Sequence, residues 1–340
     1  MGDLLMSVPA IRALKESFHC KITLLTSTLA HDIVKYITEI DEVIMYDVPW
    51  VKGGEDGATS FFDIVSMLKQ HRFDAAVIFT VFSQNPLPAA LLAFLAGIPL
   101  RLAYCRENPY HLLTDWVAEK EPYTFIRHQV KRDLDLVANV GATTNNEHLS
   151  LYIPENEWPN IQERMIQAGI DITKPWLIMH PEVSEKKREY PQELWLETAK
   201  KIISELNYQI IITGTASSNS FSNFLREKIG KDIFSFAGLL DIGQFITLIH
   251  HAPLVISVNT ATVHIASATG TPIVVLYALT NPQHTPWKCP AKVLFFDIPE
   301  QARSRNEVLK YLYTHVFDKP VSIPGAEDII NAVQDLLGQS

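Results

Sequence analysis

The sequence predicts an α/β protein made of two doubly wound domains, and three observations support this prediction. The chain has 340 residues, which is long for one hydrophobic core and suits two domains. Short runs rich in Val, Ile and Leu alternate with amphipathic stretches along almost the whole chain. These runs are apolar at successive positions, as parallel strands covered by helices on both faces are.

Apolar runs with the length of buried strands occur in both halves of the chain. We expect strands at 21–26, 42–46, 75–79, 100–104, 176–180, 209–213, 233–237, 254–258, 272–277 and 292–296. Amphipathic helices are expected at 7–18, 61–71, 126–140, 192–206, 220–229, 242–250, 262–269 and 326–337. The most apolar window, 87–100, is too short to span a bilayer and is expected to form a buried helix.

Proline-containing segments suggest where the domains end. Segment 151–170, with Pro154 and Pro159, is expected to be a hinge between an N-terminal domain, 1–150, and a C-terminal domain, 171–323. Residues 324–340 are expected to form a terminal helix that packs back on the N-terminal domain.

The N-terminus departs from the doubly wound scheme. Such a domain begins with a central strand that leads into its first helix, whereas this sequence enters a helix almost directly after Asp3. We therefore expect the reading frame to extend upstream of Met1. As the sequence stands, we expect the first sheet to show a gap or an unpaired edge between 21–26 and 75–79.

Charge, cysteine content and missing motifs exclude several classes of function. The net charge of −9 argues against general nucleic-acid binding, which needs a basic face. The three cysteines are far apart and form no disulfide framework or CxxC pair, which favours a reducing cytoplasm. No signal peptide, dinucleotide fingerprint or P-loop motif is present in the sequence.

The most informative motif is SVNTATVH at 257–264, where a strand ends in small and hydroxyl residues and a helix begins near Thr262. Free backbone N–H groups and the helix dipole favour an anion there, and small residues let a phosphate approach. His264 falls in the first turn of this helix. The alternative is an ordinary turn in which Asn259 or Thr260 caps the helix.

A second motif, HPEVSEKKREYP at 180–191, follows the strand expected at 176–180. Its three consecutive cations, at 186–188, stand at the carboxyl end of that strand, where ligands of α/β sheets bind. A basic cluster there suits a diphosphate, and the alternative is a solvated run of charges. A third turn, which includes Gly214 and Thr215, has the same strand-to-helix position and suits a nucleotide pocket.

Three acidic or basic features remain. Asp3 precedes the first expected helix, where it could act as a general base on a hydroxyl group or simply cap the helix. Asp133 and Asp135 have a DxD spacing, but in mid-helix their side chains diverge and cannot share a metal. His250 and His251 are expected to end a helix, near the negative pole of its dipole.

Together these segments resemble glycosyltransferase family 9, which includes the ADP-heptose:lipopolysaccharide heptosyltransferases. The family opens with a strand, followed by a Gly-Asp pair and a helix that contains Pro-Ala. Its most specific motif is Asp-(Ser/Thr)-Gly-x-x-His-(Leu/Ile) followed by Gly-(Thr)-Pro. The similar segments here are Gly2-Asp3, Pro9-Ala10, His180-Pro181, Arg188-Glu189-Tyr190-Pro191, Asn259 to His264 and Gly270-Thr271-Pro272. The usual Asp and Gly of the motif are replaced by Asn259 and Ala261, and Ser217 replaces an acidic residue common in the family.

The resemblance implies a GT-B fold, in which two Rossmann-like domains face each other across a cleft. It implies an inverting sugar transfer with Asp3 as the base. The donor-binding residues that we expect are Ser184, Lys187, Arg188, Gly214, Thr215, Asn259, Thr260, Ala261, Thr262 and His264. Anionic groups of the acceptor are expected to meet Arg101, Arg106, Lys131 and Arg132 in the first domain.

The same resemblance implies the partners. The donor is a nucleotide sugar, with ADP-heptose the first candidate, and the acceptor is the lipopolysaccharide core or a related glycan. No cofactor or metal is expected, and the location is the cytoplasm with peripheral contact at the inner membrane. Two alternatives stay open at this point: another nucleotide sugar or glycan, and a catalytically silent nucleotide-sugar-binding protein. The oligomeric state is left open.

Overall fold

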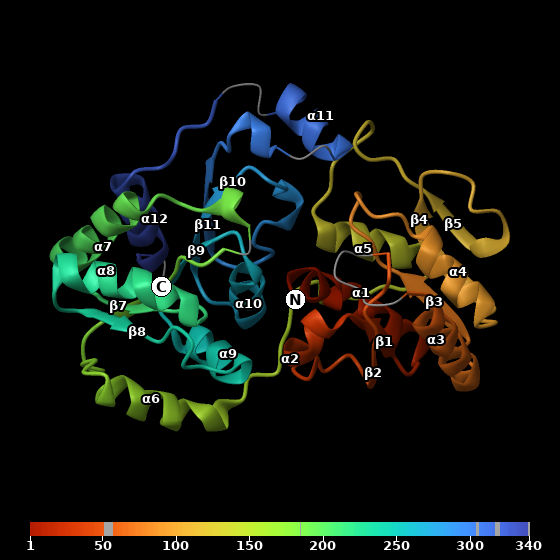
Figure 1. Cartoon of the computed structure of the whole chain (residues 1–340), viewed down its shortest axis with the longest axis horizontal. Helices are drawn as coiled ribbons and strands as arrows, with labels where there is room; N and C mark the ends of the chain where they lie inside the picture. Colours follow the sequence, from red (N-terminus) through yellow and green to blue (C-terminus); the bar gives the residue numbers. More distant parts are fainter. Residues whose placement is uncertain (51–56, 184, 304–305, 317–319, 339–340) are drawn as a thin grey trace. The chain divides into compact units, whose positions relative to one another are not determined.

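The computed structural model describes residues 1–50, 57–183, 185–303, 306–316 and 320–338. The chain folds into two compact units (Figure 1). Unit 1 holds residues 3–147 and 306–312, and unit 2 holds residues 148–303 and 313–338.

Unit 2 contains one parallel sheet of six strands. The strands are β6 (Trp176–His180), β7 (Gln209–Ile212), β8 (Ile233–Ser235), β9 (Val255–Val258), β10 (Ile273–Ala278) and β11 (Ala291–Phe296). Their order in the sheet is β11-β10-β9-β6-β7-β8. Numbered within the unit, this is the 3-2-1-4-5-6 order of a dinucleotide-binding fold read from the other edge. The strand order therefore reverses between β6 and β9.

Helices cover both faces of this sheet. α7 (Gln192–Leu206), α8 (Asn219–Ile229) and α12 (Ala326–Leu337) gather on one face, where Trp195 and Ile329 join a continuous apolar core (Figure 1). α9 (Ile242–His251) and α10 (Ala261–Thr269) pack against each other on the other side. The 3₁₀ helix η3 (Glu155–Glu157) and α6 (Trp158–Gln167) precede β6 and pack on α9.

Two expectations for this unit are corrected. Most of the segment 151–170, expected to be a hinge, is helical, because Pro159 falls at the start of α6, where proline favours a helix. The terminal helix α12 has the expected bounds, but the core that it packs on is that of unit 2, against α7, β10 and β11. Its buried side chains, among them Ile329 and Val333, complete the core of the sheet that precedes it.

Unit 1 contains two separate parallel sheets. β1 (Thr23–Thr26) pairs with β2 (Glu42–Met45), and β4 (Leu100–Cys105) lies between β3 (Ala75–Ile78) and β5 (Asp115–Ala118). No pairing joins β1 to β3 within the described residues. The expected gap between these two strands is therefore present, at the place that a doubly wound order gives to its first strand.

The helices of unit 1 are α1 (Gly2–Phe18), α2 (His31–Val34), α3 (Gly57–His71), α4 (Leu87–Leu95) and α5 (Gln129–Ala138). The later helix α11 (Glu307–His315) has its residues up to Leu312 in unit 1 and the rest in unit 2. The expectation that α1 begins at residue 7 is wrong. The helix starts at Gly2 and carries Pro9 in its interior, because burial of residues 5–14 outweighs the local cost of that proline.

α4 also differs from the expected buried helix. It ends at Leu95, and three of its large apolar side chains are exposed: Leu91, Phe94 and Leu95. Its sequence is apolar on all sides, so the pattern does not reveal which face lies against the sheet. Among the described helices, none is both long and apolar enough to cross a membrane.

Candidate functional site

The loop after β6 and the turn after β9 lie side by side because their strands are neighbours at the switch point. The pairing sets His180 of β6 opposite Ser257 of β9. Just beyond these residues, Arg188 Nη1 donates a hydrogen bond to the backbone oxygen of Asn259, with 3.2 Å between the two atoms. The structure therefore brings the two motifs of residues 180–191 and 257–264 together.

The turn after β9 is not closed by a side-chain cap. Thr260 is the N-cap residue of α10, and its side chain accepts no hydrogen bond from the helix. Asn259 Nδ2 donates instead to Thr280 Oγ1 at 2.9 Å. The alternative of an ordinary capped turn is therefore wrong, and the first N–H groups of α10 are not covered by either side chain.

Buried polar atoms in the same turn lack partners. Asn259 Oδ1 and Thr260 Oγ1 are buried and make no hydrogen bond with any described residue. Ala261 and Thr262 begin the helix, and the buried His264 lies in its first turn. A buried polar atom without a partner costs free energy, so such atoms are typical of sites that a ligand completes.

Basic residues of the β6 loop share one carboxylate. Glu185 contacts Lys187 Nζ at 2.8 Å through one oxygen and Arg188 Nη2 at 2.5 Å through the other. Burial pushes the pKa of Glu185 upward, but Lys187 and Arg188 outweigh it and hold that pKa below its usual value. Arg188 is thereby held against the Asn259 turn while its charge remains partly exposed. Ser184, the other donor residue expected in this loop, lies outside the described residues.

The third turn, at 213–218, is held by Glu182, an acidic residue of the β6 loop that is not among the expected donor residues. Glu182 Oε2 accepts hydrogen bonds from the Thr215 backbone N–H at 2.5 Å and from Ser218 Oγ at 2.6 Å. Its other oxygen, Oε1, accepts from Thr215 Oγ1 at 2.9 Å. Burial raises the pKa of Glu182, but these hydrogen bonds outweigh burial and keep it below its usual value. Glu182 comes directly after His180-Pro181, at the carboxyl end of β6, and this position is the feature of the sequence that could have marked it as a site residue.

Gly214 makes the approach of Glu182 possible. Its φ of +149° is a conformation that residues with a Cβ rarely adopt. A Cβ at this position would lie 2.6 Å from Glu182 Oε2 and 2.4 Å from Ser218 Oγ. The glycine therefore keeps the turn open for a carboxylate that arrives from the neighbouring strand.

His180 ties the ends of β6 and β7 together. Its Nδ1 lies 3.0 Å from Thr213 Oγ1. Desolvation lowers the pKa of His180 to about 4, although the nearby Glu182 acts in the opposite direction. The ring is therefore neutral at neutral pH and serves as a hydrogen-bonding group rather than a cation.

A cavity of ≈ 1100 Å³ lies beside the β6 loop in unit 2. Glu182, Lys187 and Ser217 are among its lining residues, together with the aromatic side chains of Tyr190, Trp195, Phe221 and Phe296. Arg188 and the 259–262 turn are not among them. The cavity thus adjoins only part of the expected donor site. Because ligands of this fold bind where the strand order reverses, we expect an anion at the ends of β6 and β9 and not in this cavity.

The comparisons with known proteins identify the family. A model of glycosyltransferase family 9 (heptosyltransferase) matches residues 62–311. The chain belongs to glycosyltransferase family 9. Lipopolysaccharide heptosyltransferase 2 of Escherichia coli (strain K12) is 25% identical over 304 residues, covering 84% of this chain and 82% of that protein. The chain is therefore a heptosyltransferase-like glycosyltransferase.

Solved structures of the family share the fold. The family 9 glycosyl transferase from Veillonella parvula DSM 2008 matches with a TM-score of 0.78 and 18% identity, covering 100% of this chain and 94% of that one. The E. coli ADP-heptose lps heptosyltransferase II matches with a TM-score of 0.72 and 22% identity, covering 99% and 96%. The expected GT-B fold with two Rossmann-like domains is confirmed.

In unit 1 of this glycosyltransferase, Asp3 is exposed in the first turn of α1. The N-cap residue is Met1, so Asp3 is not the helix cap that the sequence left as an alternative. A carboxylate in the first helical turn interacts favourably with the helix dipole.

Two expected acceptor residues are corrected. Arg101 is buried, and its guanidinium donates to the backbone oxygens of Ile98, Pro99, His111 and Leu112. Arg132 is 1% exposed and pairs with Glu119 at 2.5 Å and Glu121 at 3.1 Å. Both guanidinium groups are occupied inside the unit, so neither is available to an acceptor. Arg106 and Lys131 are exposed and remain candidates.

The Asp133-Leu134-Asp135 segment lies within α5, and its two carboxylates have different partners. Asp133 accepts from Ser7 Oγ at 2.7 Å and from Gln129 Nε2 at 2.8 Å, whereas Asp135 pairs with Arg127 and Lys131. Ser7 Oγ also lies 3.2 Å from the backbone oxygen of Asp3. Asp133 therefore supports the N-terminal turn that carries Asp3.

The Asp133 contact predicts a pH dependence of stability. Burial, with a contribution from Asp3, raises the pKa of Asp133 to about 7, although Ser7, Arg132 and Gln129 oppose the shift. The pKa of Asp133 is higher in the folded chain than in the unfolded chain. The free energy of unfolding is therefore highest, as far as Asp133 is concerned, below pH ~4, and it falls as the pH rises to about 7. In the wild type, ionisation of Asp133 should lower the free energy of unfolding by roughly 2–3 kcal/mol between pH 5 and pH 7. We expect this decrease to be absent in Asp133→Asn.

Urea unfolding at both pH values measures this difference. Asp135→Asn, on the same helix but paired with cations, is the matched control and should keep the wild-type pH profile. An Asp133→Asn protein whose stability falls as steeply as the wild type over this range would contradict the assignment.

The Gly214 geometry predicts the effect of a single methyl group. In Gly214→Ala, the new Cβ displaces the Glu182 carboxylate and strains a positive φ, so the free energy of unfolding should fall by about 1–3 kcal/mol. Gly270→Ala is the control, because Gly270 also has a positive φ but no heavy atom near the added Cβ. Denaturant titrations should show the larger loss for Gly214→Ala; equal losses would mean that only backbone strain matters.

Proposed function

We propose that this glycosyltransferase transfers heptose from ADP-heptose to a lipopolysaccharide-core acceptor, with inversion at the anomeric carbon. Family membership supports sugar transfer, and the E. coli relative and solved structure bear the names of lipopolysaccharide heptosyltransferases. The observation that carries the proposal is the contact of Arg188 with the Asn259 turn at the β6–β9 switch point. Phosphate groups of nucleotides bind at such switch points in this class of fold.

The donor diphosphate, in this proposal, meets Arg188 on one side and the N-terminus of α10 on the other. The uncapped N–H groups near Ala261 and Thr262 donate to phosphate oxygens, and Thr260 Oγ1 and Asn259 Oδ1 gain partners from the ligand or its waters. Lys187 adds positive charge to the same side. These groups stabilise the negative charge that develops on the departing nucleoside diphosphate.

The nucleoside part of the donor is assigned to the 213–218 turn. Glu182 supplies a carboxylate there, next to Ser217, which stands where many family members have an acidic residue. Gly214 and Thr215 form the backbone of this turn. A carboxylate held by three hydrogen bonds keeps lone pairs for the hydroxyl groups of a ribose.

The acceptor hydroxyl is deprotonated by Asp3 in this mechanism. Its oxygen attacks the anomeric carbon, the bond from that carbon to the diphosphate oxygen breaks, and the configuration inverts. The proton stays on Asp3 until solvent removes it. We assign the leaving-group role to cationic side chains and a helix terminus, without a catalytic metal, because the two carboxylates of the DxD segment have separate partners.

The acceptor side is assigned to unit 1, where Arg106 and Lys131 remain exposed basic residues. Phosphate groups of a lipopolysaccharide core match their charge. Such an acceptor is built at the cytoplasmic face of the inner membrane, and we propose that the enzyme works there as a peripheral protein.

The proposed anion site predicts the effect of removing one guanidinium. Arg188→Ala should weaken ADP binding by about 1.5–3 kcal/mol, the range of a hydrogen bond to a charged group. Isothermal titration calorimetry with ADP measures the change. Arg226→Ala removes an exposed arginine from α8 of the same unit and should leave the affinity unchanged. An Arg188→Ala protein with wild-type affinity would remove this residue from the site.

The proposed base predicts a separation of binding from turnover. Asp3→Asn should lower turnover of ADP-heptose at least about a hundredfold while ADP affinity stays within a factor of about two. Release of ADP in the presence of acceptor is the assay. Glu16→Gln, which neutralises an exposed carboxylate on the same helix, is the control. Turnover by Asp3→Asn at the rate of this control would show that another group takes the proton.

A further inference from the structure

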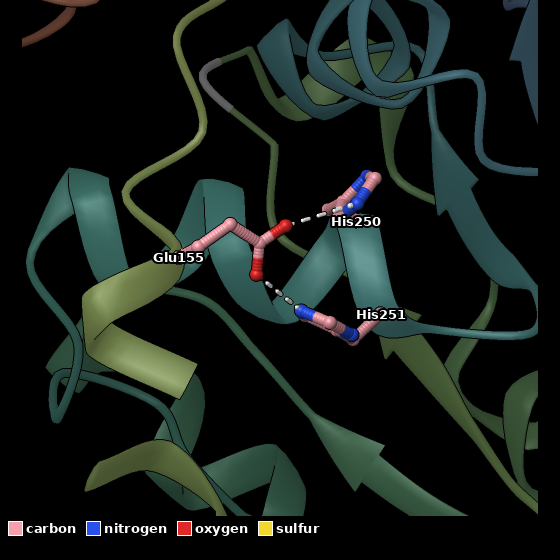
Figure 2. A group of neighbouring side chains, drawn as sticks. All are labelled: Glu155, His250 and His251. Carbon is pink, nitrogen blue, oxygen red and sulfur yellow. Dashed lines mark hydrogen bonds and ion pairs between the residues drawn. The ribbon is translucent and has the colours of Figure 1, made fainter. Parts of the chain in front are cut away.

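A cluster of two histidines and one glutamate lies away from the proposed donor site, within unit 2. Glu155 comes from η3, and His250 and His251 end α9 (Figure 2). One carboxylate oxygen of Glu155 is 3.4 Å from His250 Nε2, and the other is 2.9 Å from His251 Nε2. One ligand atom from each residue can be chosen so that all three lie within 4.8 Å of one another.

The backbone around the cluster is fixed by other contacts. Thr247 Oγ1 donates to the backbone oxygen of Pro154, the residue before Glu155, at 3.2 Å. Gln244 Nε2 donates to Glu157 Oε2 at 3.1 Å. The ring of Trp158 stacks on His251 with 4.0 Å between centroids and 10° between planes. These contacts fix η3 against α9, and they fix the ring of His251, without any contribution from the Glu155 carboxylate.

The donor set matches a particular class of ion. Two imidazole nitrogens and one carboxylate oxygen are ligands that Zn²⁺ and neighbouring divalent transition metals accept, with water as a fourth ligand. His250 Nε2 is the ring nitrogen that faces the Glu155 carboxylate, so it is the nitrogen that would meet a metal ion. The side chains are 28–56% exposed, which leaves room for an ion and its water to enter.

Electrostatics at this position also favours a cation. Both histidines stand in the last turn of α9, where the backbone carbonyl groups carry the negative end of the helix dipole. The Glu155 carboxylate adds a full negative charge. A divalent ion therefore meets a negative carboxylate, a helix C-terminus and two imidazole nitrogens.

We propose that Glu155, His250 and His251 form a site for a divalent transition-metal ion of the zinc class. The ion joins the segment that enters unit 2 to the C-terminus of α9, so its role is structural and separate from sugar transfer. A metal ion binds imidazole nitrogens that carry no proton, so acid weakens such a site.

Zinc binding to the tag-free full chain tests this proposal. After removal of metals with a chelator, calorimetric titration with Zn²⁺ at pH 7.5 should show one site, and Co²⁺ should give the visible absorption of a tetrahedral site with nitrogen ligands. Zn²⁺ should also raise the melting temperature. His251→Gln and Glu155→Gln should each weaken binding more than about tenfold, since loss of even an outer-sphere partner costs that much.

His31→Gln is the matched control. His31 also lies beside a carboxylate, with its Nδ1 3.1 Å from Asp32 Oδ1, but the two residues are adjacent in sequence and strongly exposed. This variant should bind zinc as the wild type does. Glu155→Gln keeps the size of an exposed side chain, and far-UV circular dichroism confirms that it folds.

Two outcomes would overturn the proposal. The first is a wild-type chain that takes up no zinc or cobalt at pH 7.5, with a melting temperature that does not respond to zinc. The cluster would then be a carboxylate paired with two imidazoles. The second is folded Glu155→Gln and His251→Gln proteins with wild-type zinc affinity, which would place the ion elsewhere on the chain.

Discussion

The parallel pairing of β6 with β9 is the contact on which the donor side of this protein depends. These strands are separated by more than seventy residues of sequence, yet the register sets His180 opposite Ser257. This pairing places the β6 loop and the start of α10 side by side at one edge of the sheet. A shift of β9 by one residue against β6 would turn the side chains of β9 to the opposite face of the sheet and displace Asn259 from Arg188.

Charge around the proposed diphosphate is arranged differently from the family pattern that the sequence resembles. Asn259 replaces an Asp, so the turn after β9 carries no negative charge beside the phosphate. Two carboxylates of the β6 loop, Glu182 and Glu185, lie in this region. Glu185 pairs with Lys187 and Arg188, and Glu182 accepts a hydrogen bond from the Thr215 backbone. The acidic groups near the turn thus come from the loop after β6, the strand next to β9.

Much of the architecture could be predicted because its signals are local: the buried strands of unit 2 and helix α12 follow from apolar runs and spacing. Proline is compatible with two local structures, because it breaks the interior of a helix but favours its first turn. Pro159 lies in the first turn of α6, and this helix was not predicted for that reason. Burial of charged residues could not be read from the sequence. Arg101 and Arg132 looked like acceptor-binding residues, yet their donors are occupied inside unit 1. Glu182 was overlooked because its partners belong to a different strand-to-helix turn, and no local pattern encodes such tertiary contacts.

The single six-stranded sheet of unit 2 has a consequence for how this unit exchanges its amide protons. A six-stranded sheet with helices on both faces loses its core only when many neighbours separate together, so unit 2 behaves as one cooperative block. The strands β6 and β9 lie in the middle of the strand order, and each is hydrogen-bonded on both sides. Their amide protons therefore exchange with solvent only through openings whose free-energy cost approaches that of unfolding the whole unit.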